Sequence, residues 1–480
     1  MMSLDRQRME SLLGRTCGKI ISKGLEGLVR WVSSHEETVR SARGSVTYAA
    51  DGHAENIVIT LIGEDKRAAS VSLGRSDDSG IDRAIAAAAA MLPYVPPNPY
   101  PPDLIGPGEA GEGTTEGYDE ETARGGLEIK ADFFSRAHRM AALAGYRASG
   151  RFFTGHGEIA VATTKGMFRY HPFTVASCGI VIAGASGSVS SDPDRRYVSA
   201  HAAGSGVAVR KIDGASLIDV ALERARLEAR LPFVNPFVGG ASELRFDAVL
   251  SPLAMNEWLF MLSAHGLGGL SVVEGTGCLA GKIGTRVSGE RLTLTDDWTR
   301  AGMPPLPFDS DGRDRQIVPL IERGIARGVV WDGATAKKAE GASTGHANDM
   351  LFGDESEASV MPLHLVMEGG DTAPGAMVKD AVRPTLLVSH FNYANMPDPQ
   401  GAVFTATTRH GTFLIEGGEY VAVLPPLRMQ EKSLEAFSRI EALSRSELVI
   451  PFENYGGVVP VGTLVPWTKI ADLAFIGAVI

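Results

Sequence analysis

Histidine and aspartate side chains in the second half of the chain are the groups best suited to chemistry. They are His265, Asp296, Asp309, Asp311, His346 and His364. Imidazole and carboxylate groups can hold a metal ion or exchange protons with a substrate. These residues therefore provide the material for a hydrolytic site, including a zinc site, if the fold brings them together.

No Walker A sequence and no H-E-x-x-H sequence accompanies these residues. The run His35-Glu36-Glu37-Thr38 begins like a zinc-binding helix, but Val39 follows where the second histidine would have to lie. We therefore expect this run to be the charged end of a helix rather than a metal site.

The charge balance bears on the partners of the protein. Among 480 residues, 46 are basic and 57 are acidic, which gives a formal net charge of −11. A protein that mainly grips nucleic-acid phosphates needs the opposite sign. We therefore expect no direct contact with nucleic acid.

The chain has the features of a cytoplasmic protein. Its three cysteines, Cys17, Cys178 and Cys278, are too widely separated for a disulfide framework, and such usage is typical of a reducing compartment. The N-terminal segment carries charges throughout and lacks the apolar core of a secretory signal. No stretch approaches the roughly 18 apolar residues of a membrane-spanning helix, so no membrane association is expected.

The sequence pattern of residues 1–238 predicts an N-terminal α+β domain in which antiparallel strands are flanked by helices. The order helix, three strands, helix occurs twice. The expected helices cover residues 4–31, 81–92, 127–144 and 216–231, and the expected strands cover 45–50, 56–62, 68–73, 158–163, 166–170 and 174–183. Asp51-Gly52 is expected to form a hairpin turn between the first two strands. The repeated order fits either two similar halves or one larger mixed sheet.

Residues 93–126 differ sharply in composition from the segments around them. They hold seven prolines and seven acidic residues against one arginine. Such a segment has too little apolar content to offset the entropy lost on ordering. We predict an extended connector or surface loop, with residues 103–124 as its most mobile part.

Residues 239–480 predict a separate, mostly β C-terminal domain. A strand at 246–250 is followed by an apolar helix at 252–265. Later elements are an antiparallel meander at 404–408, 412–416 and 419–424, a helix at 433–443 and a final strand at 470–480. The overall fold class is therefore α+β.

Six short patches in the second half follow one another in a fixed order. They are G-K-I-G at 281–284, L-T-L-T-D-D at 292–297, P-F-D-S-D-G at 307–312, L-I-E-R-G at 320–324, S-T-G at 343–345 and L-I-E-G-G at 414–418. In order and spacing they resemble the TldD/PmbA family, named for a microcin-processing peptidase and a modulator of DNA gyrase. The N-terminal half agrees more loosely, so the resemblance extends over almost the whole chain.

The resemblance also implies where a metal site would lie. In the TldD branch, H-E-x-x-x-H on the apolar helix and a cysteine near the C-terminus supply the metal ligands and a general base. The corresponding positions here are Phe260, Met261, His265 and Phe452. Three of the four groups are replaced by apolar side chains, which resembles the PmbA (TldE) branch and implies neither catalytic residues nor a cofactor. We expect Phe260 and Met261 to pack as core, and His265 to be a capping or core histidine.

The resemblance implies a non-catalytic subunit of a TldD/TldE-type metallopeptidase complex that encloses and degrades or processes unfolded peptides. Its expected partners are a TldD-like metallopeptidase subunit and the peptide, which a strand-rich domain can hold along a sheet edge. A homodimer could form in isolation. Two alternatives stay open. One is a gyrase-linked regulatory protein, and the other is an independent hydrolase with a relocated zinc site drawn from His265, Asp296, Asp309, Asp311 and His346.

Overall fold

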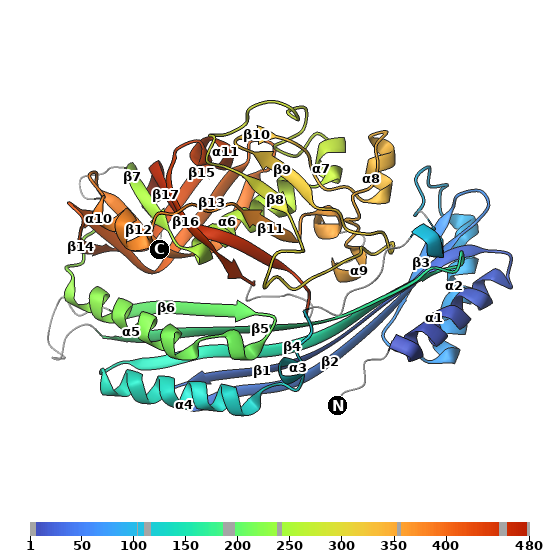
Figure 1. The fold of residues 1–480 in the computed structure, drawn as a ribbon, viewed down its shortest axis with the longest axis horizontal. Helices are drawn as coiled ribbons and strands as arrows, with labels where there is room; N and C mark the ends of the chain where they lie inside the picture. Colours follow the sequence, from blue (N-terminus) through green and yellow to red (C-terminus); the bar gives the residue numbers. More distant parts are fainter. Residues whose placement is uncertain are drawn as a thin grey trace.

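The computed structural model describes residues 6–102, 104–109, 117–185, 197–237, 242–352, 357–450 and 458–477. Within these ranges the strands form two sheets, and the chain passes from the first to the second between residues 206 and 243. Helices and strands are both extensive, and the C-terminal part is mostly strand (Figure 1). The predicted α+β class is therefore confirmed. None of the helices in these ranges is long and apolar enough to cross a bilayer.

The N-terminal sheet has six antiparallel strands in the described ranges. They are β1 (Glu26–Ala42), β2 (Ser45–Ile62), β3 (Ala68–Leu73), β4 (Arg147–Thr163), β5 (Phe168–Ala185) and β6 (Tyr197–Gly206). Their order is β3-β2-β1-β4-β5-β6, and β1 pairs with β4 at the centre, where His35 lies opposite His156. Each half of the repeated pattern contributes three strands, so the two halves share one continuous sheet.

Strand β1 begins where the sequence predicted the end of a helix. The helix α1 (Arg6–Ile21) ends earlier, and Gly24 adopts a φ of 69°, a left-handed conformation typical of residues that follow a helix. Leu28, Val29 and Trp31 are buried in the strand that follows. Leu28 fits the helical spacing of the apolar residues before it, but pairing of β1 with β2 and β4 decides the conformation of this segment. The helix prediction is therefore wrong beyond α1.

The hairpin turn predicted at Asp51-Gly52 is also wrong. Strand β2 runs through this dipeptide because it pairs with Glu36 and Glu37 of β1. The turn lies at Arg43-Gly44, where the two φ angles are 55° and 82°. Positive φ at both central residues is what a two-residue hairpin matched to strand twist requires. The run 35–38 is consequently part of β1 and not a helix end.

Two pairs of helices cover one face of the N-terminal sheet at its opposite ends (Figure 1). α1 and α2 (Asp78–Met91) pack at one end, and α4 (Leu127–Leu143) and α5 (Gly214–Arg230) pack at the other. The opposite face carries Phe173, which shares a buried cluster with Phe308 of the C-terminal part. The sheet therefore has apolar contacts on both faces.

Part of the predicted connector is packed against the rest of the protein. Leu104 and Ile105 are buried, and the Thr163 hydroxyl donates a 2.8 Å hydrogen bond to the Ile105 carbonyl. The short helices η1 (Leu92–Tyr94), η2 (Pro107–Glu109) and α3 (Glu120–Ala123) also lie in this segment. Leu104 and Ile105 are therefore packed into buried clusters, and the mobility predicted for residues 103–124 stays a prediction. Residues 103 and 110–116 lie outside the described ranges.

The C-terminal sheet contains a closed ring of strands. Its members are β7 (Glu243–Leu250), β12 (Thr385–Asp398), β13 (Val403–Glu416), β15 (Leu427–Lys432) and β17 (Gly462–Gly477), and β17 pairs back with β7. The other strands are β8 (Leu294–Asp296), β9 (Val318–Glu322), β10 (Ile325–Ala326), β11 (His364–Met367), β14 (Glu419–Leu424) and β16 (Ile440–Val449). Short helices connect them: η3 (Val209–Lys211) before the ring, then α7 (Gly269–Val273), α8 (Gly333–Lys338), α9 (Asp349–Phe352), η4 (Glu357–Val360), α10 (Pro374–Lys379) and α11 (Ser433–Phe437).

Two predicted elements of this part are corrected. The strands predicted at 404–408 and 412–416 are one strand, β13, although His410 and Gly411 lie inside it. The helix predicted at 433–443 ends at Phe437, because the residues from Ile440 onward pair with β17 as strand β16. Strand pairing overrides local preference in both cases.

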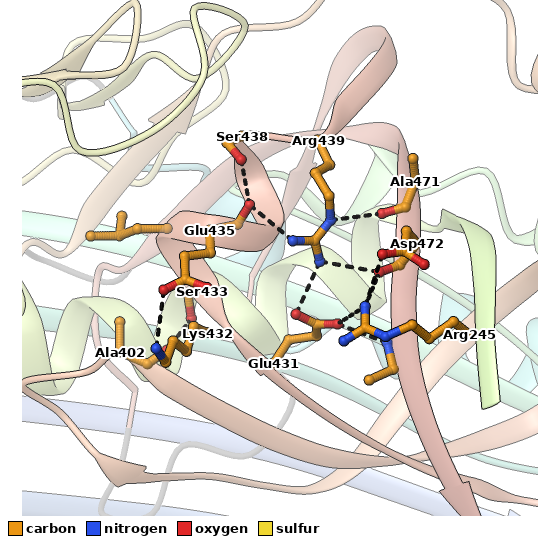
Figure 2. A network of polar contacts seen from close by, with 12 residues as sticks. Arg245, Ala402, Glu431, Lys432, Ser433, Glu435, Ser438, Arg439, Ala471 and Asp472 are labelled. Atoms are coloured by element: carbon orange, nitrogen blue, oxygen red, sulfur yellow. Dashed lines mark hydrogen bonds and ion pairs between the residues drawn. The ribbon is translucent and has the colours of Figure 1, made fainter. Parts of the chain in front are cut away.

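An ionic network joins β7, β15 and β17 (Figure 2). Glu431 of β15 accepts a 3.0 Å hydrogen bond from Nη2 of Arg439, and Nε of Arg439 donates to the Ala471 carbonyl at 3.0 Å. Arg245 of β7 lies 3.0 Å from the carboxylate of Asp472. The buried carboxylate of Glu431 is thus paired, as the burial of a charge requires.

Candidate functional site

Helix α6 (Pro252–Gly266) carries the positions at which the resemblance implies a metal motif. Ser251 caps its first turn. Trp258 anchors the helix to the core: it is 0% exposed, and its ring stacks on Phe404 with centroids 4.9 Å apart. Its Nε1 donates a 2.8 Å hydrogen bond to the Ser433 hydroxyl. The helix is therefore held rigidly on the C-terminal ring.

The motif positions on α6 differ in burial. Phe260 is 37% exposed, so the expectation that it packs as core is wrong. Met261 is partly buried and packs against the C-terminal core, as expected. His265 is also only partly buried. Phe452, the fourth predicted position, lies outside the described residues.

A pocket of about 330 Å³ lies beside the end of α6. Its lining consists of Ala264, His265, Gly268, Leu270, Ser271, Glu274, Gly275, Thr276, Val360, Asp398, Pro399 and Gln400. His265 therefore lines a pocket and is not a core histidine. The imidazole, two carboxylates, two hydroxyls and an amide of this lining can all form hydrogen bonds with a polar ligand.

The donor set of α6 does not fit the zinc site that the resemblance implies. A catalytic zinc site takes three protein ligands from imidazole, carboxylate or thiolate groups. Phe260 offers a phenyl ring and Met261 a thioether, which leaves the imidazole of His265. In the described part of the chain, no three histidine, cysteine, aspartate or glutamate side chains are arranged to hold a metal ion. No chemical step is therefore assigned to a metal on this helix.

Asp296 and His346 form a buried pair away from that pocket. Nε2 of His346 lies 3.1 Å from Oδ1 of Asp296, and both side chains are fully buried. The other carboxylate oxygen accepts a 2.9 Å hydrogen bond from the His364 backbone N–H. Burial alone would raise the pKa of Asp296. Its hydrogen bond with His346 and the positive charges around it have the larger combined effect, so its pKa lies well below the usual range. Burial lowers the pKa of His346.

Asp309 and Asp311 are engaged in holding a loop. Oδ1 of Asp309 accepts hydrogen bonds from the backbone N–H groups of Asp311 and Arg313, each at 2.9 Å, and Oδ2 accepts one from Ala347 at 3.1 Å. Asp311 pairs with Nη2 of Arg30 from strand β1 at 2.9 Å. Burial raises the pKa of both carboxyl groups. Their oxygens are thus committed to the protein itself.

These groups belong to one cluster, which we call the buried polar junction. Its members are Arg30, Asp296, Asp309, Asp311, Arg315, His346, Asn348 and Asp349. Arg315 is the buried cation whose charge acts on both Asp296 and Asp309. Arg30 also contacts the Asp349 carboxylate at 2.8 Å. The structure thus brings Asp296, Asp309, Asp311 and His346 together, but none of them lines the pocket beside His265.

Sequence reasoning missed the cations of this junction and the polar lining of the pocket. Arg30 lies 281 residues before Asp311, so no local pattern could connect the two. Arg169 of β5 likewise pairs with Asp314 at 2.5 Å, although 145 residues separate the two in the sequence. A signal did exist: the acidic patch at 307–312 needs cationic partners if it is buried.

Comparison with known proteins supports the resemblance. Residues 243–477 match the family model of the PmbA/TldA metallopeptidase C-terminal domain. A relative from Methanothermobacter thermautotrophicus named metalloprotease is 23% identical over 230 residues, 48% of this chain and 49% of the relative. An uncharacterized protein from Methanocaldococcus jannaschii is 29% identical over 111 residues, 23% of this chain and 27% of the relative. The chain therefore spans half or less of the length of these curated relatives.

Solved structures show the same fold over nearly the whole chain. TldE from Thermococcus kodakarensis has a TM-score of 0.81 at 20% identity, covering 98% of this chain and 100% of that one. Two proteins described as modulators of DNA gyrase follow. The one from Thermotoga maritima has a TM-score of 0.78 at 14% identity, over 97% of this chain and 100% of that one. The one from Bacteroides thetaiotaomicron has a TM-score of 0.77 at 17% identity, over 100% of both chains.

Proposed function

Residues 243–477 of this chain match the TldD/PmbA family, and from that premise we propose that the chain is a non-catalytic, TldE-like subunit of a metallopeptidase complex. In this role it pairs with a TldD-like, metal-bearing subunit and helps to enclose an unfolded peptide for degradation or processing. The observation that carries the proposal is the donor set of α6. Phe260 and Met261 stand where the resemblance implies a metal ligand and a general base.

The exposure of Phe260 also supports a role in contact rather than in catalysis. A phenyl ring that is 37% exposed on a rigid, anchored helix offers apolar area to another molecule. Aromatic side chains are enriched at protein interfaces because they bury much area with few rotatable bonds. The ring is therefore suited to contact the partner subunit or the peptide.

The pocket beside His265 supplies a complementary polar surface. Ser271 and Thr276 contribute hydroxyl groups, and Gln400 contributes an amide that donates a 3.2 Å hydrogen bond to the Gly275 carbonyl. Such groups can hydrogen-bond the amides of an extended peptide without reading its sequence. The proposed subunit would thus hold substrate while the partner cleaves it.

A reconstitution assay tests this function. The purified chain alone is expected to show no hydrolysis of an unfolded, fluorogenic peptide, with or without added zinc. A TldD-like subunit with the chain should cleave the same peptide, and omission of the chain should reduce that activity. Hydrolysis by the chain alone would contradict the proposal. If this hydrolysis by the chain alone were lost in the variants Asp296→Asn and His346→Ala, the result would support the alternative of an independent hydrolase.

Restoring two motif residues tests the description of α6. The double variant Phe260→His with Met261→Glu is expected to fold, because Phe260 is exposed and only Met261 packs on the core. The loss in stability should be about 1–2 kcal/mol, within the range of ordinary single substitutions. It should gain no peptidase activity, because the position of Phe452 still lacks a thiol.

Thermal melts of the double variant with and without zinc give the measurement. Phe260→Ala and Met261→Leu are the matched controls for the loss of each native side chain. A loss above about 4 kcal/mol, typical of large core truncations, would show that the phenyl ring is packed after all. Zinc-dependent hydrolysis by the double variant would show that Phe260 and Met261 alone account for the lack of peptidase activity in the native chain.

A further inference from the structure

Three histidines meet where the N-terminal sheet contacts the C-terminal ring. His201 lies on β6, His390 on β12 and His410 on β13. The ring centroids are 5.5 Å apart for His201 and His390, 5.2 Å for His201 and His410, and 5.9 Å for His390 and His410. We call these residues the three-histidine cluster. Figure 1 shows β6 and α5 lying against this side of the C-terminal part.

The backbone is irregular at two of these histidines. His410 has a φ of 60°, a left-handed conformation that is uncommon for residues other than glycine, and Gly411 follows with a φ of 90°. In β12 the register with β13 shifts between Val388 and His390. Strained backbone and β-bulges persist where the surrounding structure requires a side chain to point in a particular direction. Here both irregular positions bring an imidazole to the contact with β6.

In the described part of the chain, the guanidinium charges of Arg224 and Arg409 disfavour a positive charge on these rings. The charged or titratable side chains that the described residues place near the cluster include Arg224 and the buried carboxylate Glu228 of α5, Arg409 of β13, Tyr420 of β14 and Glu447 of β16. Glu228 accepts a 3.2 Å hydrogen bond from the Ser199 N–H, and Glu447 and Tyr420 act on Arg224. The Ser199 hydroxyl lies 2.9 Å from Nδ1 of His410. Two guanidinium groups therefore stand beside three imidazoles.

Burial and these charges hold the three imidazoles neutral. Burial and the charge of Arg409 together lower the pKa of His390 to about 4, and burial with the charges of His390 and Arg409 lowers the pKa of His410 to about 3. Burial, with the other two histidines, lowers the pKa of His201 well below its usual range. Neutral imidazoles can pack in contact, whereas protonated ones at these distances repel one another.

We propose that the three-histidine cluster is an acid-sensitive contact between the N-terminal sheet and the C-terminal ring, firm while its imidazoles are neutral and loosened when they are protonated. The buried polar junction, in which Arg30 of β1 pairs with Asp311, joins the same two parts at another point. Acidification would therefore loosen the chain at β6. This inference does not depend on whether α6 is catalytically silent.

The direction of the pH effect follows from proton linkage. Each folded-state pKa lies below the value of an exposed histidine, so the closed contact binds fewer protons than the open one. The stabilisation is complete above about pH 6.5 and is lost as the pH falls toward about 4. For His390 alone, with a pKa of about 4 closed and 6.5 open, opening should be about 25-fold more favourable at about pH 5 than at about pH 7.5.

Hydrogen exchange of the full chain tests the proposal. Exchange of amides in β6, normalised to those at the centre of the sheet in β1 and β4, should rise at least about tenfold between about pH 7.5 and about pH 5. In the triple variant His201→Gln, His390→Gln and His410→Asn, the rise should fall below about twofold. Asparagine tolerates the left-handed backbone at position 410. His138→Gln on α4 is the matched control, a partly buried histidine with a lowered pKa outside the cluster, and should keep the full rise.

Two outcomes would overturn the proposal: unchanged protection of β6 in the acid, or an equal rise in the triple variant. If the triple variant is already loosened at neutral pH, imidazole NMR titration of the wild-type chain decides instead. His201, His390 and His410 should then titrate below about pH 5, together with the loss of β6 protection. Ordinary midpoints near about pH 6.5 would refute an acid-sensitive contact.

Discussion

Replacing Arg30 by methionine is expected to lower the free energy of unfolding by about 3–5 kcal/mol. Arg30 is 4% exposed, donates to the Ser310 carbonyl at 2.7 Å and pairs with the carboxylates of Asp311 and Asp349. Methionine fills much of the same volume but leaves two carboxylates without their cation. Breaking one side of a buried ion pair is costly because the remaining charge stays desolvated.

Urea titrations of wild type and Arg30→Met measure this loss. Arg124→Met removes a solvent-exposed pair with Glu120 and is the control, for which the urea midpoint should stay nearly unchanged. The penalty of Arg30→Met should be smaller at about pH 5 than at about pH 7.5. The reason is that the pKa of Asp311 is already raised by burial, and without Arg30 the folded chain gains stability by protonating it. A loss below about 1 kcal/mol at neutral pH would mean that other groups compensate these carboxylates.

Helices α4 and α5 could be predicted from the sequence because their signals are local. α4 and α5 match the predicted ranges 127–144 and 216–231 within two residues at each end. Their apolar residues recur at helical spacing on one face, and Asp213 caps α5 by accepting a hydrogen bond from the Ser216 N–H. Such information lies within a few residues of the element itself.

The long strands could not be bounded in the same way. Asp51-Gly52 lies inside β2 because it pairs with Glu36 and Glu37 of β1, and His410-Gly411 is an irregularity inside β13, whose flanking residues pair with β12. Trp31 and its neighbours were assigned to a helix because their spacing fits both periods over so short a run. The pairing of β1 with β2 and with β4, the latter over 100 residues away, distinguishes the two.

The candidate residues show the same division between local and distant information. The sequence predicted the apolar helix at 252–265 and the acidic patch at 307–312, and the structure brings Asp309 and Asp311 together with Asp296 and His346. What the patches could not contain is Arg30, which makes that cluster a buried contact between two parts of the chain. A patch of carboxylates in the sequence resembles a reactive site. Its buried cationic partner, which the sequence does not place nearby, shows that it is a structural contact instead.

Trp258→Ala is expected to cost about 3–5 kcal/mol, the range for truncating a fully buried large aromatic side chain. Trp258 is 0% exposed and lies 4.8 Å from Phe437 and 4.9 Å from Phe404 between ring centroids. Its loss would leave a cavity under α6 and an unpaired Ser433 hydroxyl.

Phe260→Ala, two residues further along the same helix, is the matched control. Because its ring is 37% exposed, the free energy of unfolding should change by less than about 1 kcal/mol, as judged by urea titration. The same variant should weaken assembly with a TldD-like subunit or binding of the peptide, measured by titration of the two components. Equal losses of stability in the two variants would contradict the packing of α6. A stable Phe260→Ala chain that assembles and supports cleavage like wild type would show that the Phe260 ring is not part of the proposed contact. The exposed face of α6 would then contribute neither to folding nor to assembly with the partner.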